Sequence, residues 1–247
     1  MSDIMFEGLR NPTVAKKARP FFSDIVNDSG ELLHSIHLTG SALTEDYDKK
    51  TSDINSVIVL KQMDLGFLET LAPKGRKYRK SSIASPLIMT PEYIENSLDV
   101  FPLEFLNIRL CHKTVYGDDI FADIVISMDD LRHQCEREIK SKLIGLRQGY
   151  LSSMGDSRKL AESFSSSITG HIPLFRGILK LRGGTPPLLA HEVIDTLAER
   201  TQVDCSAFKQ VLLAKRAGFE KGSLNTMFER YYNATEQLRK AVDEINL

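Results

Sequence analysis

The residues best suited to chemistry lie between positions 38 and 60, in the stretch LTGSALTEDYDKKTSDINSVIVL. A Gly-Ser pair, Gly40 and Ser41, follows one short apolar run, and a polar loop then leads to a second apolar run. Glycine lets a ligand come close to the backbone, and serine offers both its N–H and its hydroxyl to a phosphate oxygen. If a short helix begins at Ala42, its free N–H groups point at the same anion. The pair therefore predicts a phosphate-binding turn.

Two oxygen-bearing side chains, Asp53 and Asn55, open the second apolar run. If that run is a strand, alternation puts both of them on one face and Ile54 on the opposite, buried face. Oxygen ligands beside a phosphate turn are what Mg²⁺ uses when it holds a nucleoside triphosphate. The stretch predicts a site for magnesium and nucleotide, although an amide stands where a second carboxylate would help most.

The segment TGSALTEDYDKKTSDINSVIV resembles the nucleotidyltransferase superfamily typified by DNA polymerase β. That superfamily carries a Gly-Ser pair, a loop of about this length and an Asp-x-Asp or Asp-x-Glu at the start of the next strand. The resemblance covers roughly residues 30–120 and implies that Gly40, Ser41 and Ser52 bind the nucleotide. It also implies that Asp53 is a catalytic metal ligand, with Asn55 as a neutral ligand of the same Mg²⁺.

A third carboxylate on a later strand completes the site in this superfamily, and the resemblance assigns it to Glu104 in FPLEFLNIRLCHKTVYG. Small bacterial members have a carboxylate-bearing strand followed by a segment like TVYG. On such a strand, Glu104 shares a face with Pro102 and Leu106. Glu104 is thus expected to bind the metal and to accept the proton of the attacking hydroxyl. Asp99 is its rival as the metal ligand.

The amide at Asn55 decides between two functions. The resemblance implies an enzyme that uses Mg²⁺ to move a nucleoside monophosphate from a nucleoside triphosphate to an acceptor hydroxyl on a small molecule or protein. Losing one electrostatic contribution to the transition state costs about 3 kcal/mol or more, so the alternative is a catalytically impaired nucleotide-binding or regulatory module. An interaction protein, such as one half of a toxin–antitoxin pair, is the third possibility.

Short β-branched or aromatic runs alternate with helical segments up to about residue 126. Their patterns predict strands at 31–40, 54–60, 85–90, 100–110 and 113–117. Helices are expected at 12–27, 64–79 and 90–97, and Pro20 should kink or interrupt the first of them. We therefore expect an α+β fold, whose first domain, residues 1–126, is a mixed sheet with flanking helices.

From Ser127 onward, helical periodicity dominates the sequence. A helix starting near Ser127 carries an apolar stripe from Leu131 to Tyr150. Further helices are expected at 157–169, 172–182, 187–200, 204–217 and 222–245, separated mainly by glycine and proline. The second domain, residues 127–247, should be an antiparallel helical bundle, similar in kind to those of kanamycin-nucleotidyltransferase-like proteins.

The composition of the 247-residue chain narrows its partners. With a formal net charge of −1, it has no overall field that would draw nucleic acid or an anionic membrane, so small acceptors are favoured over polynucleotides. Three widely spaced cysteines form no disulfide framework, and no long apolar run predicts a membrane span. These features are typical of a cytoplasmic protein.

A basic run and four histidines are further candidates for a site. The basic run KGRKYRK, residues 74–80, could attract phosphate, but a solvated helix end is the favoured interpretation. His34 and His37 flank a strand close to the Gly-Ser motif and are expected to be structural. His112 and His133 have no recognisable partner.

Overall fold

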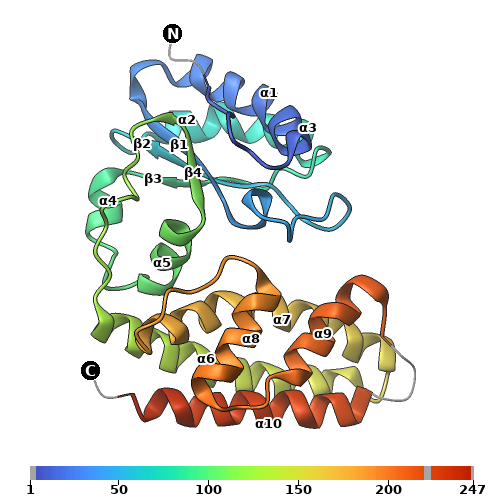
Figure 1. Ribbon diagram of the computed structural model, residues 1–247. Coiled ribbons are helices and arrows are strands. Elements are labelled where there is room, and N and C mark those ends of the chain that lie inside the picture. Colours follow the sequence, from blue (N-terminus) through green and yellow to red (C-terminus); the bar gives the residue numbers. More distant parts are fainter. Residues whose placement is uncertain (1–3, 220–223, 246–247) are drawn as a thin grey trace. The chain divides into compact units, whose positions relative to one another are not determined.

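The computed structural model describes residues 4–219 and 224–245 (Figure 1). Its chain contacts divide into two compact units. The N-terminal unit consists of residues 1–98 and 107–125, and the C-terminal unit consists of residues 99–106 and 126–247. The short segment 99–106 thus groups with the C-terminal helices, which the patterns of the sequence do not indicate. The predicted division at 126/127 stays an expectation.

The N-terminal unit is built on a four-stranded mixed sheet in the order β3-β2-β1-β4. The strands are β1 (Leu33–Thr39), β2 (Asn55–Leu60), β3 (Leu87–Met89) and β4 (His112–Gly117). Strand β1 pairs antiparallel with both β2 and β4, whereas β3 joins β2 in parallel. Four of the five predicted strands are confirmed, each with small shifts at its ends.

Helices pack on one face of this sheet. They are α1 (Pro12–Ser29), α2 (Leu65–Leu71) and α3 (Gly75–Arg79), with a 3-10 turn at Ala72–Lys74 between the last two (Figure 1). Their apolar side chains share one core with alternate residues of the strands, such as Ile36 and Ile58. Asn11 caps α1 by accepting from the Thr13 N–H, and the helix continues through Pro20 instead of ending there.

The predicted strand at 100–110 is wrong, because this segment forms helix α5 (Pro102–Leu110). Leu103, Phe105 and Leu106 are all buried, which suits a helix that is enclosed on more than one side. In so short a run, alternation and helical spacing are hard to tell apart. Pro102 at the first helical position favours the helix, since its missing N–H costs nothing there. The short helix α4 (Pro91–Glu95) begins as expected, with Thr90 as its cap.

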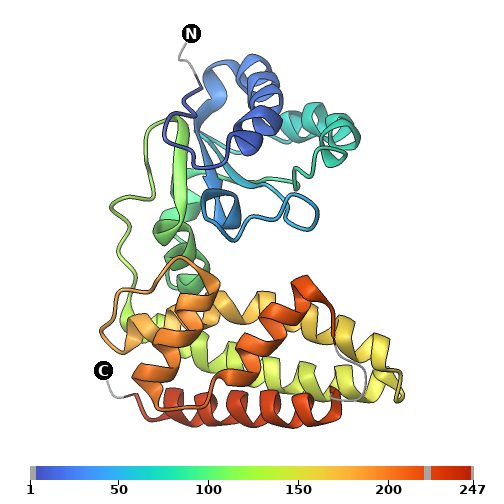
Figure 2. The ribbon, with the colours of Figure 1, turned by 45° about the vertical axis from the view of Figure 1, so that its right-hand side comes forward.

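The C-terminal unit is helical. Its long helices are α6 (Met128–Ser153), α7 (Ser157–Leu181) and α10 (Leu224–Asp243), and α10 lies along α6 (Figure 2). Helices α8 (Ala190–Thr201) and α9 (Ser206–Ala217) pack against α7. Residues 222 and 223, where the last helix was expected to begin, lie outside the described residues.

The predicted break near Gly170 does not occur, because α7 runs continuously through Gly170 and Pro173. Glycine within this helix serves packing. A Cβ built at Gly177 would lie 2.6 Å from Leu103 Cδ1 and 2.7 Å from Cys135 Sγ. Gly177 thus allows α7 to approach α6 and the start of α5 closely. Among the described residues, no helix is long and apolar enough to cross a membrane.

Candidate functional site

The phosphate turn predicted at Gly40 follows directly from strand β1. Residues Gly40–Leu43 form a 3-10 helix, so the helical turn starts at Gly40 and not at Ala42. Gly40 has a φ of +72°, a value that side-chain-bearing residues rarely adopt. Its N–H donates to the carbonyl of Cys111 at 3.1 Å, which ties the turn to the residue before β4. The Gly40 N–H is therefore engaged within the protein, and glycine is required here by conformation.

Ser41 is the donor that this turn leaves available. Its carbonyl accepts the Thr44 N–H at 3.0 Å, and this bond closes the 3-10 turn. The Ser41 hydroxyl makes no hydrogen bond within the described part of the chain. Ser52 stands at the other end of the loop, where its hydroxyl accepts the Asp48 N–H at 3.0 Å. Ser52 keeps its own hydroxyl hydrogen for donation, so it can brace the loop and still contact a ligand.

Asp53 and Asn55 are exposed on either side of Ile54, which is fully buried. Ile54 forms a parallel bridge with Ile83, and this contact fixes the strand face on which its two neighbours lie. Asn55 pairs with Thr39 across β1 and β2, and a Cβ on Gly40 would lie 3.9 Å from Asn55 Nδ2. The fold thus brings the phosphate turn and the Asp-Ile-Asn segment together at one edge of the sheet.

The side chains at this edge fit one magnesium ion. Asp53 supplies a carboxylate that forms no ion pair within the described residues, and Asn55 supplies an amide oxygen. Mg²⁺ commonly takes one or two protein oxygens and completes its shell with water and substrate phosphates. Asp46 and Asp48 lie in the adjoining loop, where Asp48 Oδ1 accepts the N–H groups of Lys50 and Thr51.

The sequence led us to expect Glu104 on a strand beside Asp53 and Asn55, but it does not lie on a strand. It lies in the first turn of α5, within the C-terminal unit. Its carboxylate accepts from Gln134 Nε2 at 2.6 Å, and Gln134 Oε1 accepts the Leu103 N–H at 2.7 Å. Gln134 is buried, so this pair of bonds fastens the start of α5 to α6. Asp99, the rival metal ligand, also belongs to the C-terminal unit.

A cluster of two histidines and one aspartate lies on the sheet of the N-terminal unit. Ligand atoms of His37, His112 and Asp119 lie within 4.8 Å of one another. His112 Nε2 is 2.8 Å from Asp119 Oδ1, so His112 has a partner that its sequence context does not indicate. His37 contacts the hydroxyls of Ser35 and Thr114 at 2.8 and 2.9 Å. Because both of its ring nitrogens are already engaged, His37 fits the structural role expected of it better than that of a metal ligand.

Burial sets the protonation of His37. Desolvation is the main cause that lowers its pKa to about 4, and the neighbouring His112 lowers it further. For Asp119, burial opposes the effect of His112, whose hydrogen bond and charge leave the pKa below its usual range. His37 is therefore neutral at pH 7, whereas the lowered pKa of Asp119 keeps that carboxylate charged.

The basic run at 74–80 contains two pocket-lining residues that the sequence did not indicate. It forms α3, and two of its side chains, Arg76 and Arg79, line the same pocket as Asp53. A helix-end interpretation treats all the basic residues of the run alike. Their spacing alone could not have separated the two that line the pocket from those that pair with α1.

A mixed sheet with flanking helices, followed by a helical part, makes this an α+β protein with a nucleotidyltransferase fold. A solved structure with similar architecture is that of spectinomycin adenyltransferase AAD(9) from Enterococcus faecialis, determined with ATP and spectinomycin. The TM-score is 0.54 and the sequence identity is 14%, over 92% of this chain and 100% of that one. Neither a known family profile nor a curated protein matches the sequence. At this identity, the likeness shows the fold alone.

Proposed function

We propose that the protein is a magnesium-dependent nucleotidyltransferase, which moves a nucleoside monophosphate from a nucleoside triphosphate to an acceptor hydroxyl. The observation that carries the proposal is the arrangement at the sheet edge. There the phosphate turn at Gly40 and Ser41 adjoins Asn55, next to an exposed Asp53 that has no ion-pair partner among the described residues. A nucleotidyltransferase fold and an adenyltransferase as structural neighbour support it.

Each side chain has a role in the proposed reaction. Ser41 and Ser52 donate to the triphosphate from the two ends of the loop. Asp53 and Asn55 hold Mg²⁺, which supplies positive charge against the phosphates when it is bound. The acceptor oxygen attacks the α-phosphorus, the bond from that phosphorus to the bridging oxygen breaks, and pyrophosphate leaves with the electron pair. The acceptor proton passes to a carboxylate or to water.

The test measures pyrophosphate release from ATP and CTP in the presence of Mg²⁺, together with nucleotide binding by calorimetry. Asp53→Ala should abolish turnover. Glu31→Gln is the matched control, because Glu31 is also exposed on this unit but precedes β1, whereas the phosphate turn follows that strand. Loss of turnover in both variants, or in neither, would contradict the proposal.

A catalytically impaired nucleotide-binding module is the second candidate, and two observations favour it. Asn55 provides no charge, and the carboxylate of Glu104 is engaged with Gln134 in the C-terminal unit. The impaired module would bind nucleotide without releasing pyrophosphate, and Asn55→Asp would create turnover. The enzyme instead shows turnover in the unmodified chain, and Asn55→Asp changes it from a working baseline.

Glu104 remains the proposed third carboxylate, and one substitution separates its two possible roles. Glu104→Gln keeps an oxygen that can accept the Gln134 hydrogen bond, so α5 should stay attached to α6. If Glu104 holds metal or takes the acceptor proton, turnover falls at least about 100-fold while the free energy of unfolding stays the same. If Glu104 only braces the helix, neither quantity changes appreciably.

A further inference from the structure

A pocket of about 570 Å³ lies in the N-terminal unit beside Asp53. Its volume is within the range of small-molecule sites. Helices α2 and α3 and the segment leading into β3 line most of it, with apolar side chains such as Leu68 and Ile83. The charged groups that line the pocket are Asp53, Arg76 and Arg79. The pocket thus combines an apolar wall with two guanidinium groups and one carboxylate.

Three side chains of this helical segment attach it to α1, and one of them, Tyr78, also lines the pocket. Lys74 forms an ion pair with Asp28, and Lys77 forms one with Asp24 at 3.3 Å. The hydroxyl of Tyr78 also donates to Asp24, and this bond is the largest cause that holds the Asp24 pKa below its usual value. Tyr78 is nearly fully buried and lies 4.7 Å, between ring centroids, from Phe21. These contacts fix which side of α3 remains for the pocket.

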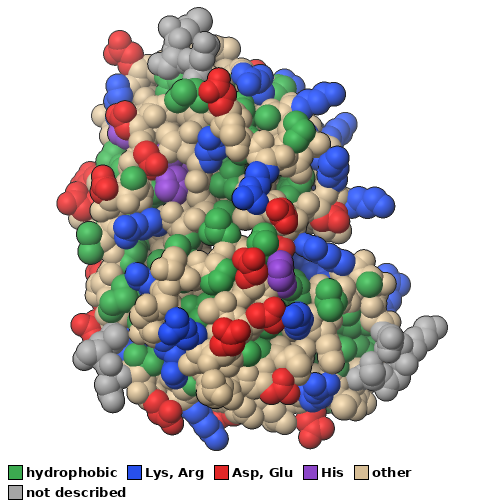
Figure 3. All heavy atoms as spheres, in the orientation of Figure 1, with side chains coloured by type: hydrophobic (Ala, Val, Ile, Leu, Met, Phe, Trp, Pro, Cys, Tyr) green, Lys and Arg blue, Asp and Glu red, His purple; other side chains and the backbone are tan. Residues whose placement is uncertain are grey.

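Arg76 and Arg79 occupy that remaining side. They are three residues apart, which places them on neighbouring positions of one helix face. Neither guanidinium group has an ion-pair or hydrogen-bond partner within the described residues, and neither pairs with Asp53. Figure 3 shows Lys and Arg side chains projecting from the edge of the N-terminal unit where α1 and α3 lie. Two exposed guanidinium groups beside an apolar pocket are suited to a bidentate anion, such as a carboxylate or a phosphate.

The position of the pocket relative to the phosphate turn indicates which substrate it would take. The sheet order places β2 between β1, which ends at the turn, and β3, which follows the pocket-lining segment. Asp53 and Asn55, at the start of β2, therefore lie between the turn and the pocket. In phosphoryl and nucleotidyl transfer, the attacking oxygen and the leaving oxygen lie roughly in line, on opposite sides of the phosphorus. A pyrophosphate on the β1 side requires an acceptor on the β3 side.

We infer that this pocket binds the acceptor, and that the acceptor is a small, largely apolar molecule carrying a carboxylate or phosphate group. This inference rests on the proposed function and specifies its second substrate. Arg76 and Arg79 hold the anionic group, and Leu68 and Ile83 contact the apolar body. The acceptor hydroxyl faces Asp53, forms the new bond to the α-phosphorus as pyrophosphate leaves, and loses its proton to that carboxylate or to water.

The binding test uses aromatic probes of one size and different charge. Benzoate and phenyl phosphate are the two anionic probes. Comparing them shows whether the pocket prefers a carboxylate or a phosphate group. Benzyl alcohol is the neutral probe and benzylamine the cationic one. Ligand-observed NMR and calorimetry with the full chain should give affinities at least about tenfold higher for one or both anions than for benzylamine.

Variants of α3 then locate the binding. Arg76→Gln and Arg79→Gln should each weaken the preferred anion by about tenfold, because each removes charge-assisted hydrogen bonds. Lys80→Gln is the matched control. Lys80 is the exposed residue that directly follows α3, and it does not line the pocket. Affinity for ATP with Mg²⁺, measured in parallel, should stay within about twofold in all three variants, whereas Asp53→Ala lowers it.

Three results would overturn the inference. One is a failure of the anions to bind better than benzylamine. Another is a loss of ATP affinity in Arg76→Gln or Arg79→Gln, which would make the pocket part of the nucleotide site. The third is anion binding that depends on the arginines in a chain that binds no nucleotide. That third result refutes the proposed function as well, whereas the first two leave it standing.

Discussion

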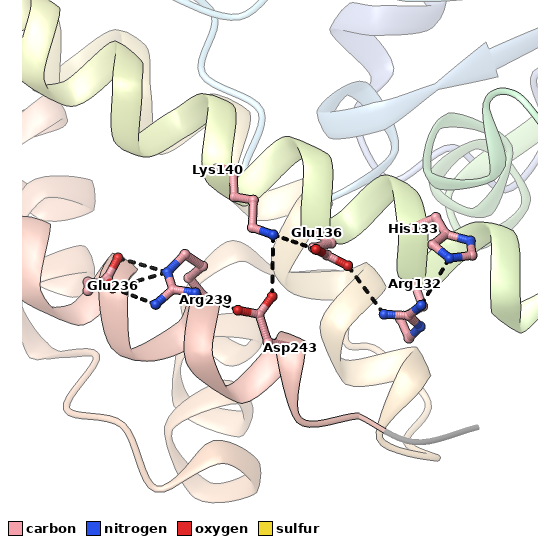
Figure 4. Close-up of polar contacts among 7 residues, drawn as sticks. All are labelled: Arg132, His133, Glu136, Lys140, Glu236, Arg239 and Asp243. Atoms are coloured by element: carbon pink, nitrogen blue, oxygen red, sulfur yellow. Dashed lines mark hydrogen bonds and ion pairs between the residues drawn. The ribbon is translucent and has the colours of Figure 1, made fainter.

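Charged side chains are arranged differently in the two units. In the N-terminal unit, Asp53, Arg76 and Arg79 line one pocket without ion-pair partners among the described residues. In the C-terminal unit, charges on α6 and α10 form a connected chain (Figure 4). Lys140 bridges Glu136 and Asp243, and Arg239 joins Asp243 to Glu236.

This difference separates charges that remain for a ligand from charges used within the protein. The pairs on α6 and α10 lie at the surface, where each contributes at most about 1 kcal/mol to stability. The hydrogen bonds that Lys140 and Arg239 donate are the largest causes that lower the pKa values of Glu136 and Glu236. Asp53, Arg76 and Arg79 in the N-terminal unit have no such hydrogen bond from a charged partner among the described residues. Anions and metal ions should bind most favourably to these groups, because no internal ion-pair partner has to be displaced.

Neutralising one carboxylate in each unit should give opposite results. Asp53→Asn should lower pyrophosphate release at least about 100-fold, because it removes a charge that acts on the transition state. Its free energy of unfolding should stay the same or rise, as is common when a functional charge is removed. Glu136→Gln should leave turnover within about twofold and cost up to about 1 kcal/mol of stability. Steady-state assays and urea unfolding check both. Equal losses of turnover would remove the distinction between the units.

Acidification should affect the two units alike, since each contains one buried histidine. Burial lowers the pKa of both His37 and His171 from 6.5 to about 4. The unfolded chain binds more protons between these values, so the stabilisation is complete above pH 6.5 and is lost as pH falls toward 4. Each histidine should contribute a loss of up to about 3 kcal/mol.

Urea unfolding from pH 7.5 to 4 measures this loss, and NMR of the ring protons reports each protonation. Substituting His37 or His171 by Gln should flatten the pH dependence of its own unit. His191, which is exposed on α8, is the control position. A histidine that gains its proton near pH 6.5 while the chain is still folded would refute the assignment for that unit.

Close packing of α7 predicts a smaller effect that is confined to the C-terminal unit. Gly177→Ala places a methyl group against Leu103 and Cys135, which should cost about 1–3 kcal/mol. Gly145→Ala on α6 is the matched control, because a Cβ there meets nothing within 4 Å. The control should be neutral or should stabilise the protein by up to about 1 kcal/mol. Thermal unfolding distinguishes the two, and turnover by the folded Gly177→Ala protein should stay unchanged.

Salt should produce the smallest effect and should again separate the units. Raising the ionic strength from about 0.05 to about 0.5 M screens the exposed pairs on α6 and α10 and should cost less than about 1 kcal/mol of stability. Anion binding at Arg76 and Arg79 should weaken severalfold over the same range. Titrations with benzoate or phenyl phosphate at several salt concentrations measure this. Salt-independent binding would indicate that the guanidinium groups do not contact the probe.

The conformation of the Gly-Ser turn and its flanking strands could be predicted because their signals are local. Gly40 is required by a positive φ, and the order exposed–buried–exposed at residues 53–55 follows from alternation along one strand. The helices with well-defined caps, such as α4 with Thr90, were also found from sequence. In each case the residues that determine the structure lie within a few positions of one another.

The errors concern features that depend on distant residues. Helix α5 is held by Gln134, about 30 residues further along the chain, and nothing within the segment itself indicates this contact. The basic run divides into two sets because Asp24 and Asp28 on α1 pair with only some of its side chains. The partnership of His112 with Asp119 likewise depends on how the chain turns after β4.

Helix α3 and the turn before it are attached to α1 by their own side chains, which bind Asp24, Asp28 and the Pro20 carbonyl, whereas the Gly-Ser turn and Asn55 adjoin each other through the hydrogen-bonded sheet. Under the proposed assignment, the groups that carry out the reaction are thus separate from the groups that select the acceptor. Substitutions on α3 or on the facing side of α1 can reshape the pocket without moving Asp53 or the Gly-Ser turn. The same scaffold could then adapt to new acceptors through a few surface changes, and laboratory evolution of acceptor range should concentrate its mutations on α1 and α3.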